Sequence, residues 1–220
     1  MRERSAKPKR APLSRERVVT AAMALADEKG QVGVTMRAVA ARLGVEAMSL
    51  YNHVAGREDI LGGMVEAVFA EIDLPASTTD WKQALRDRSA SARTVLRRHP
   101  WAVGLLDSRK EPGPATLRHH DAVLGALRAG GFSVAMAARA FSVIDSYLYG
   151  FVLQELSLPF TNSAELDEVA SDILRDLPAG TYPNLAAVVT EQVLAPGYDS
   201  DDDFEFGLML ILDALQPDKA

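Results

Sequence analysis

Apolar residues recur at intervals of three and four positions along most of the chain. In the first such stretch, residues 13–29, they stand at Val18, Val19, Ala22, Leu25 and Ala26. This spacing places them on one face of a helix. Ser14 is a residue type that caps helix starts and Gly30 one that ends helices, so both limits of the first predicted helix are marked.

Two short predicted helices and a longer one come next. Thr35 can cap the second helix, which we expect to end at Gly44, where glycine adopts a positive φ without strain. Only three residues separate this helix from a third, predicted over 47–53. A break at residues 55–56 precedes a fourth helix, predicted over 57–72.

Pro75 and the polar residues 76–80 mark the first boundary in the pattern. Further helices are predicted over residues 80–98, 100–107, 114–129, 133–157, 164–176, 183–194 and 201–215. The sequence lacks the sustained alternation of apolar and polar positions that strands show, so the predicted fold class is all-α. The predicted parts are a flexible basic arm at residues 1–12, a three-helix domain at 13–56, a connecting helix at 57–74 and a C-terminal helical domain at 75–220.

Charge is divided unevenly along the chain. Residues 1–60 hold 11 Lys and Arg against 7 Asp and Glu, whereas residues 61–220 hold 13 against 23. The arm alone carries five basic residues and one Glu. This asymmetry favours an N-terminal end that meets a polyanion. The alternative is a solubilising tail without a partner.

Composition excludes several other classes of protein. Apolar residues make up 48% of the 220 positions, which is ordinary globular usage, and the chain has no cysteine. Disulfides, thiolate metal sites and thiol nucleophiles are therefore excluded. No run of about eighteen apolar residues and no signal-peptide pattern is present. We expect a cytoplasmic protein without a membrane partner.

The second and third predicted helices, joined by a short turn that contains Gly44, form a helix-turn-helix pattern, TMRAVAARLGVEAMSLYNHV. The second helix of such a unit lies in the major groove of DNA. The side chains expected to face outward there are Ala47, Met48, Ser49, Asn52 and His53. The expected phosphate contacts come from Arg37, Tyr51, Arg57 and the basic arm. The alternative is a helical hairpin inside a larger α-protein.

Residues 13–72 closely resemble the DNA-binding region of the TetR family of transcriptional repressors, with LGV-x-x-x-x-LY-x-HV as the most specific element. The resemblance implies that Arg37 reaches the groove from the start of the second helix and that residues 47–49 read bases. It implies phosphate contacts for Tyr51 and His53, and for Arg57 at the start of the fourth helix. Tyr51 can alternatively belong partly to the core.

Residues of about 99–160 resemble the C-terminal domain of the tetracycline repressors in the stretches LLDSR, AGGFS and YLYGFVLQE. The resemblance implies a small-molecule inducer bound in this domain and a homodimer built from the helices at 133–157 and 201–215. Both helices are also what ordinary core helices look like.

The resemblance breaks at the metal site of the tetracycline repressors. Where those proteins hold magnesium with a His and a Glu, this chain has Leu105 or Leu106 and Gln154, and Leu cannot bind a metal. We therefore expect neither a metal nor another cofactor. The candidate ligand-binding residues are Trp101, Leu105, Arg109, Phe132, Tyr147, Phe151 and Gln154. Most of them suit a core equally well, and Arg109 suits an exposed loop.

These patterns favour one functional hypothesis and leave two alternatives. We expect a DNA-binding transcriptional regulator, a homodimeric repressor released from a palindromic operator by a small and largely apolar ligand. The alternatives are an all-α enzyme with an apolar pocket and an interaction adaptor. Against the enzyme, the sequence has no convincing constellation of acid, base and nucleophile.

Overall fold

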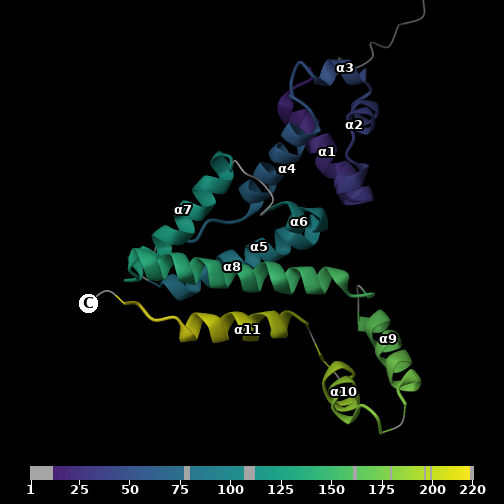
Figure 1. The fold of residues 1–220 in the computed structure, drawn as a ribbon, viewed down its shortest axis with the longest axis vertical. Coiled ribbons are helices and arrows are strands. Elements are labelled where there is room, and N and C mark those ends of the chain that lie inside the picture. The colour runs from purple at the N-terminus through teal and green to yellow at the C-terminus, as the bar shows by residue number, and fades with distance from the viewer. Residues whose placement is uncertain are drawn as a thin grey trace, which may run out of the picture. The chain divides into compact units, whose positions relative to one another are not determined.

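The computed structural model describes residues 12–76, 80–106, 112–160, 163–178, 180–195, 197–198 and 200–218. These residues form helices and turns without a strand (Figure 1), which confirms the predicted all-α class. The predicted arm lies outside them except for Pro12. Within the described ranges, no helix combines the length and the apolar character needed to cross a membrane.

The chain divides into two compact units. The first unit contains the residues up to Pro75 together with Ala90–Val123. The second contains Ala76–Ser89 and Leu124–Ala220. Two continuous helices, α5 (Trp81–Arg98) and α7 (Pro114–Ala129), supply residues to both units.

The N-terminal part of the first unit is a helical head. Its elements are α1 (Arg15–Lys29), the 3-10 turn η1 (Gln31–Gly33), α2 (Met36–Leu43), α3 (Ala47–Leu50) and α4 (Arg57–Glu71). The predicted caps are confirmed. The Ser14 hydroxyl accepts from the N–H of Arg17, and the Thr35 hydroxyl accepts from that of Ala38. Gly44 ends α2 in the left-handed conformation, with φ 67° and ψ 40°.

A small apolar core holds the head together. Helix α1 packs on α2 and α4, and α2 packs on α3. The side chains that lose all solvent contact are Val18, Ala22, Val34, Val39, Leu50, Ile60, Met64 and Val68. Burial of a large apolar side chain stabilises a fold by about 1.5–3 kcal/mol, so this core fixes how the short helix α3 is presented.

The rest of the first unit contains the last turns of α5, the 3-10 turn η2 (Pro100–Ala102), α6 (Val103–Leu106) and the first turns of α7. Trp101, Leu105 and Leu106 are buried in it. Because η2 contacts α1, this part of the chain touches the head directly.

The second unit contains α8 (Val134–Ser157), α9 (Ser163–Asp176), α10 (Pro183–Val188), the π-helical turn η3 (Val189–Val193) and α11 (Ser200–Ala214). Helices α8 and α11 pack side by side (Figure 1). The predicted helix at 183–194 changes at Val189 from α-helical to π-helical hydrogen bonding, since the Leu194 N–H reaches the Val189 carbonyl at 2.9 Å.

A buried ion pair links α5 to α8 inside the second unit. The Arg88 Nη1 atom lies 2.5 Å from the Asp145 Oδ1 atom, and the Arg88 side chain has no solvent exposure. Removal of charges from water is costly, and breaking such a pair costs about 3–5 kcal/mol because one charge stays buried alone. Helical periodicity gives no sign of this pair, since its partners are 57 positions apart.

Candidate nucleic-acid interface

The predicted reading helix is shorter in the structure than in the prediction. Residues 47–50 are α-helical and 51–53 form a turn, whereas we predicted a helix over 47–53. The Tyr51 and His53 N–H groups bond to carbonyls three residues back, at 3.3 and 2.8 Å. These tighter bonds end the α-helix and bring the next residue, Val54, into the core at 3% exposure.

Side chains of α3 and its turn divide between core and solvent. Leu50 has no exposure, whereas Met48 is 75% and Tyr51 is 51% exposed. Asn52 is also exposed, and His53 is half-buried. Among the other predicted contacts, Arg37 is exposed, and Ala47 and Ser49 are half-buried. The head thus exposes Met48, Tyr51, Asn52 and Arg37 to solvent.

Arg57 braces the head. Its Nε atom donates to the Val34 carbonyl at 2.8 Å and its Nη2 atom to the Gln31 carbonyl at 3.2 Å, so the guanidinium ties the start of α4 to the η1–α2 turn. The phosphate contact predicted for Arg57 remains a prediction. If it forms, it uses a guanidinium that two backbone carbonyls already orient.

Two further ion pairs fix the helices of the head. The Arg15 Nη2 atom lies 2.7 Å from Asp59 Oδ1, while Asp59 Oδ2 accepts from the Ala55 N–H at 2.9 Å just before α4. Arg42 at the end of α2 lies 2.8 Å from Glu28 on α1. The hydrogen bond from Arg42 lowers the pKa of Glu28. Exposed pairs contribute little to stability because water and salt screen them, so these two pairs mainly orient the helices.

The predicted ligand residues fall in different parts of the chain. Trp101 and Leu105 are buried in the first unit, and Phe132, Tyr147, Phe151 and Gln154 belong to the second. Arg109 lies outside the described residues. Within the second unit, Gln154 is exposed and the aromatic residues already have partners.

The aromatic partners come from α5 and α11. Phe132 has no exposure and packs edge-on against Trp81. The Tyr147 ring stacks on Phe204 at 5.7 Å, and its hydroxyl donates to the Phe204 carbonyl at 2.9 Å. Phe151 contacts Phe204 edge-on. These side chains therefore help to pack the core of the second unit.

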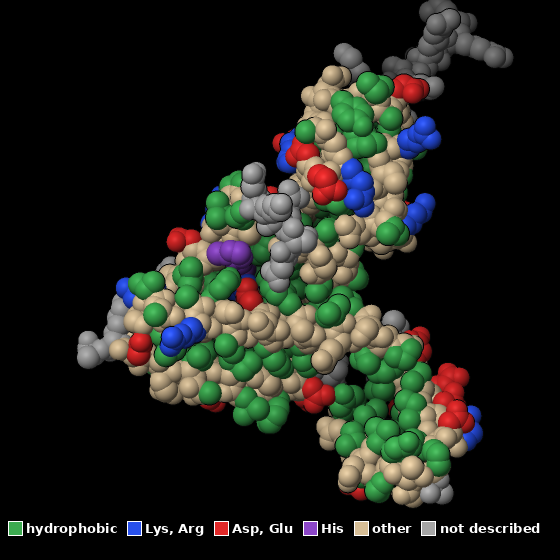
Figure 2. All heavy atoms as spheres, viewed as in Figure 1, with side chains coloured by type: hydrophobic (Ala, Val, Ile, Leu, Met, Phe, Trp, Pro, Cys, Tyr) green, Lys and Arg blue, Asp and Glu red, His purple; other side chains and the backbone are tan. Residues whose placement is uncertain are grey.

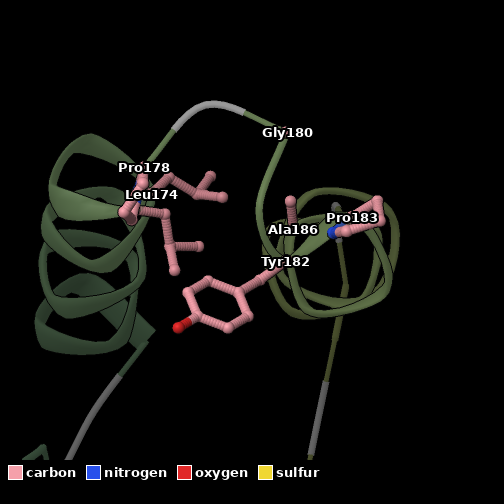
Figure 3. Close-up of a pocket in the computed structure, with 7 residues that line it drawn as sticks. Leu174, Pro178, Gly180, Tyr182, Pro183 and Ala186 are labelled. Carbon is pink, nitrogen blue, oxygen red and sulfur yellow. The ribbon is translucent and has the colours of Figure 1, made fainter.

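A pocket of about 150 Å³ opens between α9 and α10 (Figure 3). The Tyr182 ring extends toward Leu174 on α9, and Pro178 and Gly180 lie in the connecting loop. Hydrophobic side chains gather over these two helices in Figure 2, and Ile173, Tyr182, Leu185 and Val188 are exposed there. None of the predicted ligand residues lines this pocket.

A contact between α1 and η2 was not predicted from the sequence. The Asp27 Oδ1 atom on the last turn of α1 accepts from Trp101 Nε1 at 2.6 Å and lies 2.8 Å from His99 Nδ1. His99 is 5% and Trp101 is 8% exposed. Trp101 was predicted to contact an apolar ligand, but its one hydrogen-bond donor, the indole N–H, is bound to Asp27 of the head. A buried indole N–H needs an acceptor, which is the one signal in the sequence for this contact.

Glu66, on α4, was also missed. Its carboxylate accepts from the Ala115 N–H at 2.6 Å, the Thr116 N–H at 3.2 Å and the Thr116 hydroxyl at 2.5 Å, and so caps the start of α7. Burial raises the pKa of Glu66, but the hydrogen bonds from Thr116, Ala115 and Gly113 outweigh it and hold the pKa below the ordinary 4.5. A side chain at Gly113 would collide with this carboxylate.

Two family models match the chain. The model of the tetR family of bacterial regulatory proteins matches residues 18–64, and that of the tetracyclin repressor-like C-terminal domain matches residues 74–217. The first match spans the core of the head from α1 into α4. The second begins just after α4 and reaches beyond α11.

Individual proteins agree with the family models. The HTH-type transcriptional repressor DrrR1 of Streptomyces coeruleorubidus is 32% identical, over 96% of this chain and 81% of its own. The class D tetracycline repressor of Escherichia coli is 30% identical, over 87% and 83%. The solved structure of the TetR family protein ActR of Streptomyces coelicolor with actinorhodin is 27% identical, with a TM-score of 0.75 over 93% and 97% of the two chains.

The capping role of Glu66 gives a pH-dependent prediction. The carboxylate has a lower pKa in the folded than in the unfolded chain, so its stabilising contribution is full above pH 4.5 and is lost as the pH falls through the folded value. At pH 7, Glu66→Gln is expected to lower the free energy of unfolding by about 1.5 kcal/mol. Denaturant unfolding at pH 7, 5 and 4 should show the difference from wild type shrinking toward low pH.

Glu168→Gln is the matched control, because Glu168 is an exposed glutamate on α9. It should change the unfolding free energy little at any of the three pH values. If Glu66→Gln and Glu168→Gln behave alike, the carboxylate does not hold α7 in solution.

Proposed function

The chain belongs to the TetR family of DNA-binding repressors that ligands release, and from this premise we propose that two copies read one operator with α3 and the turn after it. Each head would lie in a major groove, over half-sites about one helical turn apart or slightly more. The alternatives of an enzyme or an adaptor are not favoured, since the named relatives are transcriptional regulators.

The observation that carries this proposal is the exposure of Met48 and Tyr51 beside the fully buried Leu50. A large apolar side chain that is 75% exposed on a four-residue helix contributes little to the fold of the head. Met48 suits contact with a thymine methyl group, and the Tyr51 hydroxyl suits a phosphate oxygen. Arg37 and the half-buried Ala47, Ser49 and His53 would complete the contact.

Small-molecule control is the second part of the proposal. ActR has been solved with actinorhodin and with (S)-DNPA, and a TetR of Acinetobacter baumannii with minocycline. For this chain we propose a small and largely apolar ligand, because most of the buried side chains over residues 99–106 are apolar, among them Trp101, Leu105 and Leu106. A carboxylate or imidazole ligand for magnesium is absent at Leu105, Leu106 and Gln154, which argues against a magnesium-bound drug.

A homodimer is the third part. Helix α11 presents Phe206 and Leu210, which are 68% and 57% exposed and one helical turn apart, and α8 presents Val143 and Leu153. Since α8 and α11 pack on each other, two such pairs can form a four-helix interface. Operators on the chromosome would place the dimer in the cytoplasm.

The DNA-reading proposal predicts the effect of Tyr51→Ala. Selection from random-sequence DNA should recover a palindrome, and fluorescence anisotropy on that operator should show affinity that falls steeply with salt. Tyr51→Ala should weaken binding about tenfold, which corresponds to about 1.4 kcal/mol, and should leave the dimer intact. Tyr182→Ala is the control, since Tyr182 is equally exposed but lies beside α10. Unchanged affinity of Tyr51→Ala would refute the assigned reading surface.

The dimer proposal predicts the effect of Phe206→Glu. A charge placed in the centre of an apolar interface should convert the dimer to a monomer in analytical ultracentrifugation and abolish binding to the palindrome. Leu117→Glu changes a comparably exposed apolar residue on α7 and should leave the mass unchanged. A Phe206→Glu protein that stays dimeric would show that α11 is not the interface.

A further inference from the structure

The contact between Asp27 and Trp101 joins two regions to which the proposed function gives separate tasks. Asp27 belongs to α1, the helix against which α2 and α4 pack in the head. Trp101 belongs to η2, immediately before α6, in the segment to which we assigned ligand contacts. The atoms meet within one compact unit, at 2.6 Å, across 74 positions of sequence.

The surroundings of this contact restrict how it can rearrange. The same Asp27 oxygen faces His99 Nδ1 at 2.8 Å, and the other ring nitrogen of His99 lies 3.5 Å from a Glu71 oxygen at the end of α4. Arg98 donates to that Glu71 oxygen at 2.9 Å. Residues 98–101 are therefore held by carboxylates from both α1 and α4, with His99 and Trp101 almost fully buried.

The chemistry of the indole allows the contact only two states, formed or broken. Tryptophan has a single donor and no acceptor, so its N–H points either at Asp27 or away from it. The Asp27 side chain is 34% exposed, so water can take the place of the indole if the ring turns. A ligand that reorients Trp101 would remove one of the two hydrogen-bond partners of Asp27 and free the last turn of α1.

We propose that Asp27 is a latch: through its contact with Trp101, residues 99–106 control the orientation of the whole head by way of α1. The latch rests on the proposed function. It links residues 99–106 to the head directly through α1, in addition to the link that α4 supplies. With the latch closed, the two heads of a dimer keep a fixed separation and discriminate between operators of different half-site spacing. With it open, they tolerate a wrong spacing.

The test compares Trp101→Phe with Trp81→Phe. Both variants keep an aromatic ring and lose an indole N–H, but Trp81 packs on Phe132 in the second unit and is buried to a similar degree. The readout is the ratio of affinities for the selected palindrome and for a version with one extra central base pair. Trp101→Phe should lower this ratio about fivefold, and Trp81→Phe should leave it unchanged.

A second readout needs no DNA. The amide of Gly30, which donates to the Ala26 carbonyl at the end of α1, should exchange its hydrogen at least about threefold faster in Trp101→Phe than in Trp81→Phe. Asp27→Ala also removes the contact with His99, so it should change both readouts at least as much as Trp101→Phe. The double variant should be no worse than Asp27→Ala alone, because that substitution already removes the contact with Trp101.

Each outcome decides a different claim. If Trp101→Phe changes neither spacing discrimination nor exchange at the end of α1, the latch is overturned. If exchange accelerates but spacing discrimination does not change, the contact is structural and the latch is also overturned. If the unaltered protein binds no DNA of any sequence, the proposed function fails, while exchange still reports whether Asp27 holds Trp101.

Discussion

The proposed control of the head depends on the hydrogen bonds of two carboxylates in the first unit, those of Asp27 and Glu66. Asp27 on α1 holds η2 through Trp101 and His99, and Glu66 on α4 caps the start of α7. These bonds hold residues 99–101 and 115–116, which precede and follow α6 in the sequence. Because α1 packs on α2 and α4, and α2 packs on α3, our proposal is that a change at either contact reaches α3 through the core of the head.

The strength of these contacts suits the proposed latch. A hydrogen bond to a charged group contributes about 1.5–3 kcal/mol to stability, and a typical coupling between two binding sites is about 1–3 kcal/mol. One contact of this kind is therefore large enough to shift the balance between two orientations of the head, and small enough for a bound ligand to overcome. The buried Arg88–Asp145 pair in the second unit, at 2.5 Å with no exposure of the arginine, suits a fixed link instead.

Local patterns in the sequence predicted local structure well. Ser14, Thr35 and Gly44 were predicted as helix limits and act as such, because a cap depends on residues within four positions. The tightening of residues 51–53 was missed, since it depends on how Val54 reaches the core. Asp27, Glu66 and the bracing bonds of Arg57 were missed for a related reason: their partners are 23 to 74 positions away, and neither periodicity nor composition pairs them.

The most direct test measures the distance between the two heads of the proposed dimer. The chain has no cysteine, so Val32→Cys, at an 85% exposed position of η1, accepts one spin label per protomer. Pulsed electron paramagnetic resonance spectroscopy then gives the distribution of distances between the two labels. Our account predicts a narrow distribution in an otherwise wild-type chain and a broader one when Asp27→Ala and Glu66→Gln are added. Distributions of equal width would contradict the claim that these two carboxylates hold the heads in place.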